Sequence, residues 1–463
     1  MRTTAENTVA ELLYRLAEHA ETTSSFPHDP WASGHGPGRR RTWTVGLAAA
    51  LVIGVTFAGA SLVSGPTGDR PVATGGDLAQ LPGGVTEALA ETGLNGRSDA
   101  SSVWTGRELL VWGGLTLKGS ENRWLADGAA LDPVANGWRA LPPAPIGPRS
   151  GAATVWTGSE MLVWGGYANS AMLSDGAAFN PQTNRWRAIA SSAFAGAARP
   201  AAVWTGTEML VISSMNTPPT TTAYNPRTDR WRRLAPPPGS LVVPYPQVVW
   251  TGTEAYVLLS PNRHQFAGDG STSPPPTVVD NSDRATAASP PSPPGTPPLP
   301  PVVARDPAGG PNSGMFLASY SPESDQWSRP PAIALDVSGL PRLAWTGREI
   351  LVLQRSLPSG AFEPKRQEWR SLTTVPNASS SFGARAVWTG HLVLLWGGGE
   401  AGLAYDPDID AWWTFDGGGL RSRDDAVVAW TDGLFVGWGG SNNHDDGSGR
   451  LENDGIRYRP PSR

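Results

Sequence analysis

The sequence contains no cysteine, almost no lysine and no marked excess of either charge. The absence of cysteine among 463 residues excludes disulfides, thiolate metal sites, cysteine nucleophiles and a lipid-modified cysteine anchor. Lys118 and Lys365 are the only lysines, and the other basic residues are arginines. The 36 basic and 41 acidic side chains give a formal charge of −5, so nothing in the charge balance points to a nucleic-acid partner.

Long apolar runs are also scarce, because only residues 43–64 form one without a charged side chain. A helix of roughly 20 apolar residues crosses a bilayer, so this run predicts a transmembrane helix. Arg39, Arg40 and Arg41 precede it, which places the N-terminus in the cytoplasm and the rest of the chain outside the cell membrane. An uncleaved anchor is favoured, since signal peptides usually total ~15–30 residues. Cleavage after Ala60 stays open.

The span divides the N-terminal region into a cytoplasmic tail (1–42), the transmembrane helix (43–64) and a linker (65–84). Apolar residues at steps of three and four predict an amphipathic helix over residues 5–21. This helix either lies on the membrane surface or contacts a cytosolic partner. Such a helix followed by an arginine cluster and a span resembles the cytoplasmic ends of membrane proteins that accompany sigma factors in actinobacteria. That resemblance implies a sigma-factor-type partner.

The 55 glycines and 45 prolines argue against a mostly helical protein, and the 21 tryptophans mark a repeat. The phrase Val-Trp-Thr-Gly, or a near variant, recurs at steps of 42 to 52 residues, with one doubled step of 95 residues. The first six repeats each contain four short strand patterns separated by turn residues. The repeat tryptophans are Trp104, Trp156, Trp204, Trp250, Trp345, Trp388 and Trp430. Seven blades of a β-propeller are predicted, with an open array of hairpins as the alternative.

Three features that recur among the repeats resemble the Kelch motif, which also forms the propeller of galactose oxidase. A Gly-Gly pair ends the second strand in four repeats, as in Trp112-Gly113-Gly114. An aromatic-x-Pro turn follows the third strand, as in Tyr320-Ser321-Pro322, and a tryptophan opens the fourth strand. The resemblance implies an all-β, seven-bladed Kelch-like propeller over residues 85–460. The third to fifth repeats lack the glycine pair.

The last repeat stops at Pro460 without a fourth strand. Thr86 stands 18 residues before Trp104, just as Trp138 stands 18 residues before Trp156. We therefore expect residues 86–89 to complete the last blade and close the ring. The doubled step contains a Pro-rich segment, 261–314, for which unpacked chain is expected, either as a spacer or as a tolerated surface insertion.

No catalytic, cofactor-binding or metal-binding residues are predicted. The copper-radical chemistry of galactose oxidase needs a cysteine–tyrosine crosslink, which this sequence cannot form. His391 and His444 do not share a repeat position, so an imidazole metal site is not expected. The acidic loop 442–447 fits calcium-loop spacing poorly because His444 occupies a ligand position.

An arginine shortly before the first strand is the one recurring charged feature. Several such arginines could meet near the central channel and hold carboxylate or phosphate groups, or each could fix its own loop, as is common in Kelch repeats. The candidates are Arg97, Arg149, Arg199, Arg342, Arg385 and Arg423.

A membrane-anchored, extracytoplasmic propeller that binds or senses a protein or an acidic glycan is therefore predicted, rather than an enzyme. Two alternatives remain. One is an envelope enzyme with its site at the channel mouth, and the other is a sensor whose tail regulates a sigma-factor-type partner.

Overall fold

The structure of the protein is a computed structural model, and it separates into two units. Residues 1–69 with 462–463 form one unit, and residues 70–461 form the other. The described residues all lie in the second unit and are 78–119, 121–194, 196–213, 220–238, 247–259, 316–331, 341–354, 359–375, 385–397, 401–443 and 449–461. The predicted tail helix (5–21), span (43–64) and insertion (261–314) lie outside them. Within the described residues there is no helix with the length and apolarity that a membrane crossing needs.

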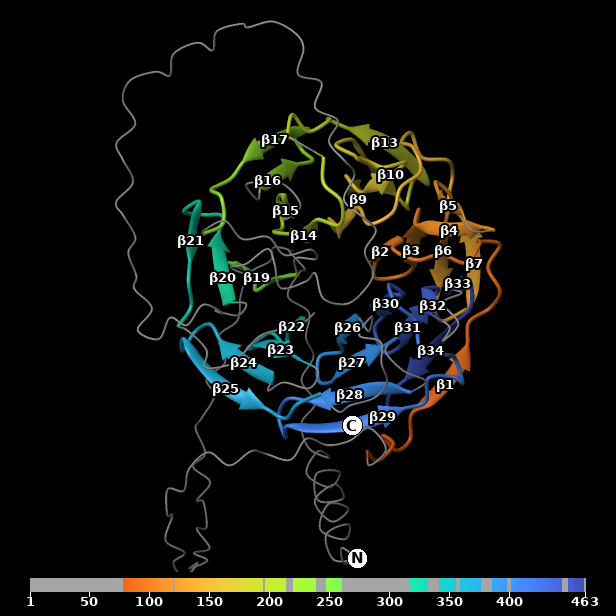
Figure 1. Cartoon of the computed structure of the whole chain (residues 1–463), viewed down its shortest axis with the longest axis vertical. Helices are drawn as coiled ribbons and strands as arrows, with labels where there is room; N and C mark the ends of the chain where they lie inside the picture. The colour runs from red at the N-terminus through yellow and green to blue at the C-terminus, as the bar shows by residue number, and fades with distance from the viewer. Residues whose placement is uncertain are drawn as a thin grey trace, which may run out of the picture. The chain divides into compact units, whose positions relative to one another are not determined.

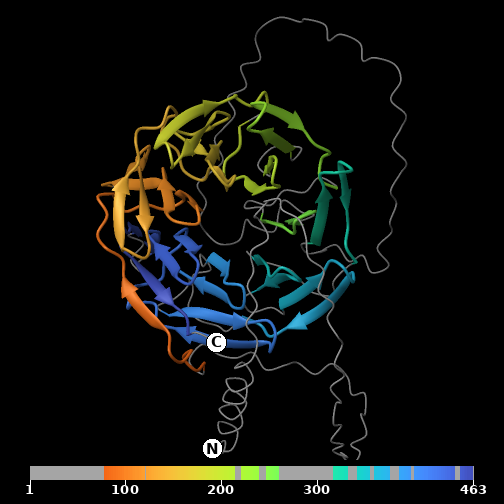
Figure 2. The same ribbon diagram turned by 180° about the vertical axis from the view of Figure 1, so that it is seen from behind.

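Seven four-stranded antiparallel sheets form a ring, which Figure 1 shows from one face and Figure 2 from the other. We number these blades along the chain. Blade 1 consists of β2 (Ser101–Trp104), β3 (Leu109–Trp112), β6 (Gly128–Asp132) and β7 (Gly137–Ala140). Blade 2 consists of β8 (Ala153–Trp156), β9 (Met161–Trp164), β12 (Gly176–Asn180) and β13 (Arg185–Ile189). Blade 3 consists of β14 (Ala201–Trp204), β15 (Met209–Ser213), β16 (Thr220–Asn225) and β17 (Arg230–Arg233).

The other four blades repeat this order. Blade 4 consists of β18 (Val248–Trp250), β19 (Ala255–Leu259), β20 (Phe316–Ser321) and β21 (Gln326–Ser328). Blade 5 consists of β22 (Arg342–Trp345), β23 (Ile350–Leu353), β24 (Ser359–Glu363) and β25 (Glu368–Leu372). Blade 6 consists of β26 (Arg385–Trp388), β27 (Val393–Trp396), β28 (Gly402–Asp406) and β29 (Ala411–Phe415). Blade 7 consists of β30 (Val427–Trp430), β31 (Phe435–Trp438), β34 (Gly455–Arg459) and β1 (Val85–Ala88).

The first strand of each blade contacts the first strand of both neighbouring blades, so these innermost strands form a continuous circle. The circle closes where β30 of blade 7 meets β2 of blade 1. Both predictions about the ring, seven blades and an N-terminal closing strand, are confirmed. β1 pairs antiparallel with β34, and Thr86 stands opposite Tyr458.

In blades 1, 2 and 7, a short two-stranded hairpin follows the glycine pair that ends the second strand. These hairpins are β4–β5 (Leu115–Lys118 with Glu121–Trp124), β10–β11 (Tyr167–Ala168 with Ala171–Met172) and β32–β33 (Ser441–Asn443 with Gly449–Leu451). Gly114 has φ +104°, and a Cβ there would lie 2.9 Å from the Ser98 carbonyl oxygen. Glycine is therefore required where the chain turns from β3 into the first of these hairpins.

The core lies between neighbouring blades. One cluster, for example, joins Leu110 and Trp112 of blade 1 to Met161 and Phe179 of blade 2, all of them fully buried. Burial of such side chains, at roughly 1.5–3 kcal/mol each, holds adjacent sheets together.

The tryptophan of the fourth strand adds a hydrogen bond between blades. In six blades its indole Nε1 donates to a carbonyl of the preceding blade, over 2.8–3.2 Å. In blade 7, Thr86 stands at this position, and its hydroxyl donates to the Asp416 carbonyl of blade 6 over 2.8 Å. The tryptophan-rich composition therefore reflects a contact that is repeated around the ring. The six residues are Trp138, Trp186, Trp231, Trp327, Trp369 and Trp412.

Candidate binding site at the inner rim

We call the first residue of each innermost strand, together with the two residues before it, the inner rim. Four of them, Asp425, Asp99, Gly151 and Arg199, stand five residues before their repeat tryptophan in blades 7, 1, 2 and 3. All four have φ between +48° and +59°. Backbone hydrogen bonds join them in that order: the Asp99 amide donates to Asp425 (3.3 Å), Gly151 to Asp99 (2.9 Å) and Arg199 to Gly151 (2.9 Å). These hydrogen bonds fix the backbone positions of the four residues relative to one another.

Two carboxylates and two guanidinium groups from four blades meet at the rim. Arg199 of blade 3 contacts Asp99 of blade 1, and its Nη2 lies 3.5 Å from Oδ2 of Asp425 of blade 7. Arg385 of blade 6 faces the same two carboxylates, with Nη2 lying 4.0 Å from Asp99 Oδ1 and 3.6 Å from Asp425 Oδ1. Each carboxylate thus contacts both arginines.

Burial shifts the pKa values of two side chains at the rim, Asp99 and Arg342. Asp99 is only 7% exposed, and burial raises the pKa of its carboxyl group, an effect that Arg199 opposes and Asp425 reinforces. Arg342, at the start of β22, lies close enough to Arg385 for the two charges to interact. Burial, with the nearby Arg385 charge, lowers the pKa of Arg342 to about 10, so this guanidinium stays protonated at neutral pH.

The six arginines predicted from the sequence occupy two different environments. Arg97, Arg149 and Arg423 stand seven residues before their repeat tryptophan and are buried. Each one bonds to the loop that links the second and third strands of its blade. Arg97, for example, donates to the Gly113 carbonyl and to the Asp127 carboxylate, both over 3.0 Å.

The other two members of this buried set behave in the same way. Arg149 bonds to Asp175 over 2.8 Å, and Arg423 bonds to the Asp454 carbonyl over 3.0 Å. These three arginines therefore hold loops, as the alternative interpretation of the pattern expects.

Arg199, Arg342 and Arg385 lie on the inner rim, and Arg385 is the most accessible of the described rim contacts. Its side chain is 49% exposed and makes two long ion pairs but no hydrogen bond within the described ranges. A guanidinium presents five donors in a planar fork that fits the two oxygens of a carboxylate or phosphate. Arg385 can therefore accept such a group without releasing a hydrogen bond.

Sequence reasoning missed the roles of Asp99, Asp425 and Gly151. A Cβ at Gly151 would lie 2.7 Å from Cγ of Arg199, so glycine leaves room for that side chain. Counting positions back from each repeat tryptophan would have found the signal, because Arg199 aligns with Asp99, Gly151 and Asp425 rather than with Arg97.

The fold defines the class of protein, a seven-bladed β-propeller, and this fold suggests a binding module. No protein-family model matches the chain. No curated protein is significantly similar to it in sequence.

Proposed function

We propose that this chain is a membrane-anchored binding protein whose propeller takes an acidic group of a protein or glycan at the inner rim. The observation that carries the proposal is the half-exposed Arg385 beside Arg342 and Arg199. Anchoring and an extracytoplasmic position for the propeller are supported by the apolar run 43–64 and the arginines before it. The glycine pairs and fourth-strand tryptophans favour a propeller of the Kelch type.

The geometry of the rim favours a bidentate contact with Arg385. Charge-assisted hydrogen bonds are usually ~2.7–2.9 Å long. The ion pairs of Arg385 with Asp425 and Asp99 measure 3.6 and 4.0 Å, so a ligand carboxylate at hydrogen-bonding distance would interact more strongly than either. Arg342 adds positive charge on the same side.

Binding is favoured over catalysis because the two carboxylates that Arg199 and Arg385 contact, those of Asp99 and Asp425, are already paired with guanidinium groups. The oxygens of both carboxylates face guanidinium groups, whereas a general base or a nucleophile needs an oxygen directed at its substrate. A sensing role, in which the 5–21 helix contacts a sigma-factor-type partner, is supported by the sequence pattern of the tail.

The test uses the full-length chain in detergent and two acidic probes, oligogalacturonate and hexaglutamate, with neutral dextran as the reference. We expect Arg385→Gln to weaken binding of an acidic probe at least about tenfold, as the loss of a charge-assisted contact implies. Arg227→Gln is the matched control, since Arg227 is an exposed arginine on the β16–β17 turn, away from the rim. Added salt should weaken the wild-type interaction.

Two outcomes would refute the proposal. One is that neither acidic probe binds the wild type more tightly than dextran. The other is that Arg385→Gln and Arg227→Gln retain equal affinity for an acidic probe. Circular dichroism of both variants would show that the ring is intact.

A further inference from the structure

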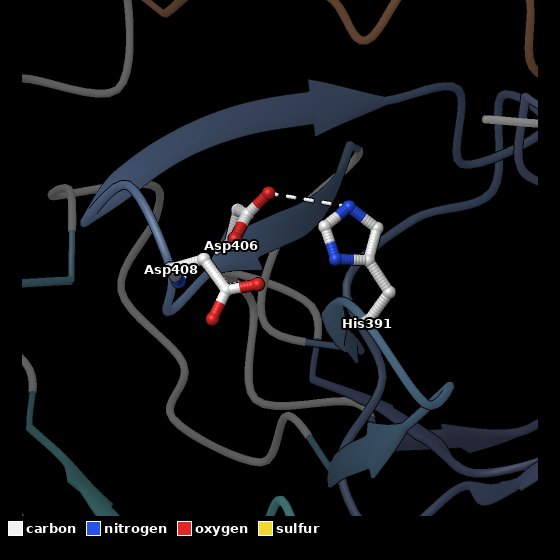
Figure 3. Close-up of side chains that lie close together, drawn as sticks. All are labelled: His391, Asp406 and Asp408. Carbon is white, nitrogen blue, oxygen red and sulfur yellow. Dashed lines mark hydrogen bonds and ion pairs between the residues drawn. The ribbon is translucent and has the colours of Figure 1, made fainter. Parts of the chain in front are cut away.

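Blade 6 carries a second cluster of polar side chains, at the end of its innermost strand away from Arg385. Figure 3 shows His391, from the β26–β27 hairpin, beside Asp406 and Asp408 at the end of β28. His391 Nε2 lies 3.2 Å from Asp406 Oδ2. One nitrogen or oxygen from each of the three residues lies within 4.8 Å of the others.

In four other blades, the hairpin between the first and second strands takes part in an ion pair of a different kind. There a glutamate in the hairpin forms an ion pair with an arginine on the fourth strand, as Glu160 does with Arg187. The same pairs in blades 1, 3 and 5 are Glu108–Arg139, Glu208–Arg232 and Glu349–Arg370. Blade 6 has Leu392 and Trp413 at these two positions, so the ion pair that joins its first hairpin to its fourth strand is missing.

The positions of His391 and Asp406 are occupied by an ion pair in blade 5. Arg348 and Glu363 occupy them, with nitrogen and oxygen 3.3 Å apart. There a permanent cation faces a carboxylate. Blade 6 instead places an imidazole, which is not a permanent cation, against two carboxylates, Asp406 and Asp408. A neutral imidazole nitrogen and carboxylate oxygens are the donors that divalent transition metals prefer.

The Asp406 carboxylate is held in position before any ion arrives. Asp406 is 7% exposed, and its Oδ1 accepts a hydrogen bond from the Asp408 amide over 2.9 Å. That bond leaves Oδ2 directed at His391 (Figure 3). Metal bonds to such ligands are ~2.0–2.2 Å long, which places neighbouring donor atoms roughly 3–3.5 Å apart. The observed 3.2 Å between His391 and Asp406 fits this spacing.

We propose that His391, Asp406 and Asp408 form a site for a divalent cation of the zinc or manganese type. The ion would join the β26–β27 hairpin to the β28–β29 turn and replace the ion pair that blade 6 lacks. Three protein ligands leave a coordination position for water or for a ligand from a partner. From sequence alone no metal is predicted here, because the three residues come together only when the two turns lie side by side.

The test measures zinc binding to the full-length chain after chelator treatment and desalting, by competition with a chromophoric chelator. The chain has 6 histidines, so the informative quantity is the difference between the wild type and His391→Gln. We expect His391→Gln to lose one equivalent of zinc, and Asp408→Asn to weaken that site at least about tenfold. Asp132→Asn is the control for the loss of one carboxylate, since Asp132 ends β6 of blade 1 as Asp406 ends β28, and it accepts a hydrogen bond from the Val134 amide.

The proposal would be overturned if the wild type, His391→Gln and Asp408→Asn bound zinc with equal stoichiometry and affinity. The contact between His391 and Asp406 would then be an ion pair like that of Arg348 and Glu363 in blade 5. A preference of the wild-type site for calcium over zinc would also overturn the proposal, because an imidazole ligand disfavours calcium. Asp408 is exposed, so Asp408→Asn should keep the fold even if His391→Gln does not.

Discussion

One tyrosine hydroxyl in blade 7 has lost the partner that its counterparts keep. Tyr405 of blade 6 donates to Oδ1 of Asp410 over 2.8 Å. Tyr458 holds the same position in blade 7, but its hydroxyl is buried and makes no hydrogen bond within the described residues. Asp410 lies in the turn between the third and fourth strands. Blade 7 has no such turn, because its fourth strand, β1, comes from the other end of the propeller sequence.

The structure therefore predicts opposite effects for the same substitution at two equivalent positions. Tyr405→Phe removes a hydrogen bond to a carboxylate, which should cost about 1.5–3 kcal/mol. Tyr458→Phe removes a buried hydroxyl that has no partner, so it should leave stability unchanged or raise it by up to about 1 kcal/mol. Phenylalanine fits the site, since Phe179 and Phe362 occupy it in blades 2 and 5.

Equilibrium unfolding in guanidinium chloride, followed by tryptophan fluorescence, measures both effects on the full-length chain. With unchanged m values, the shift of the midpoint reports the change in the free energy of unfolding. We expect a lower midpoint for Tyr405→Phe and an equal or higher one for Tyr458→Phe. The reasoning fails if the two variants lose equal stability, or if Tyr458→Phe loses more.

Two further predictions concern charge. Arg97 is buried and bonded to Asp127, so Arg97→Gln should lower the free energy of unfolding by about 2–3 kcal/mol, whereas the exposed Arg385→Gln should change it by less than about 0.5 kcal/mol. Thermal unfolding of the two variants measures this difference, and equal losses of stability would contradict the separation of loop-holding from rim arginines. Burial raises the pKa of both Tyr458 and Tyr224 to about 12, against about 10 in the unfolded chain. The stability that they contribute is complete below pH 10 and lost as pH rises towards 12. Unfolding midpoints at pH 9 and 11.5 should differ, and less so in Tyr458→Phe; identical midpoints in the wild type would rule this out.

The ring could be predicted from the sequence because its physical signals repeat. Each Val-Trp-Thr-Gly phrase marks the end of an innermost strand and the hairpin after it, and the offset from Trp104 back to Thr86 identified the closing strand. Thr86 does not resemble the tryptophan that it replaces, so spacing rather than residue type carried that prediction. The glutamate–arginine pair, such as Glu160 with Arg187, also recurs at fixed positions in the sequence, but only the structure shows that the two side chains meet.

The cluster that Asp99, Asp425, Arg199 and Arg385 form at the inner rim could be predicted only in part. Arg199 lies 100 residues from Asp99 and 226 residues from Asp425, and only the curvature of the ring brings the three together. The six arginines form a uniform row only if their distances from the repeat tryptophan are ignored. A shift of two residues separates Arg97, which holds a loop, from Arg199, which lies on the rim.

Backbone strain sets Arg199 apart from the other arginines of the row. Most of the described non-glycine residues with positive φ are asparagine or aspartate, which tolerate this conformation and here often lie in turns, as Asp410 does. Arg199 has φ +48°, a conformation that a long side chain adopts only at a cost of roughly 1–2 kcal/mol. The hydrogen bond from its amide to Gly151 and its contact with Asp99 maintain it. Arg97, which holds a loop, is not among the residues with positive φ, so we attribute the cost at Arg199 to its pairing with Asp99 and Asp425 across the ring.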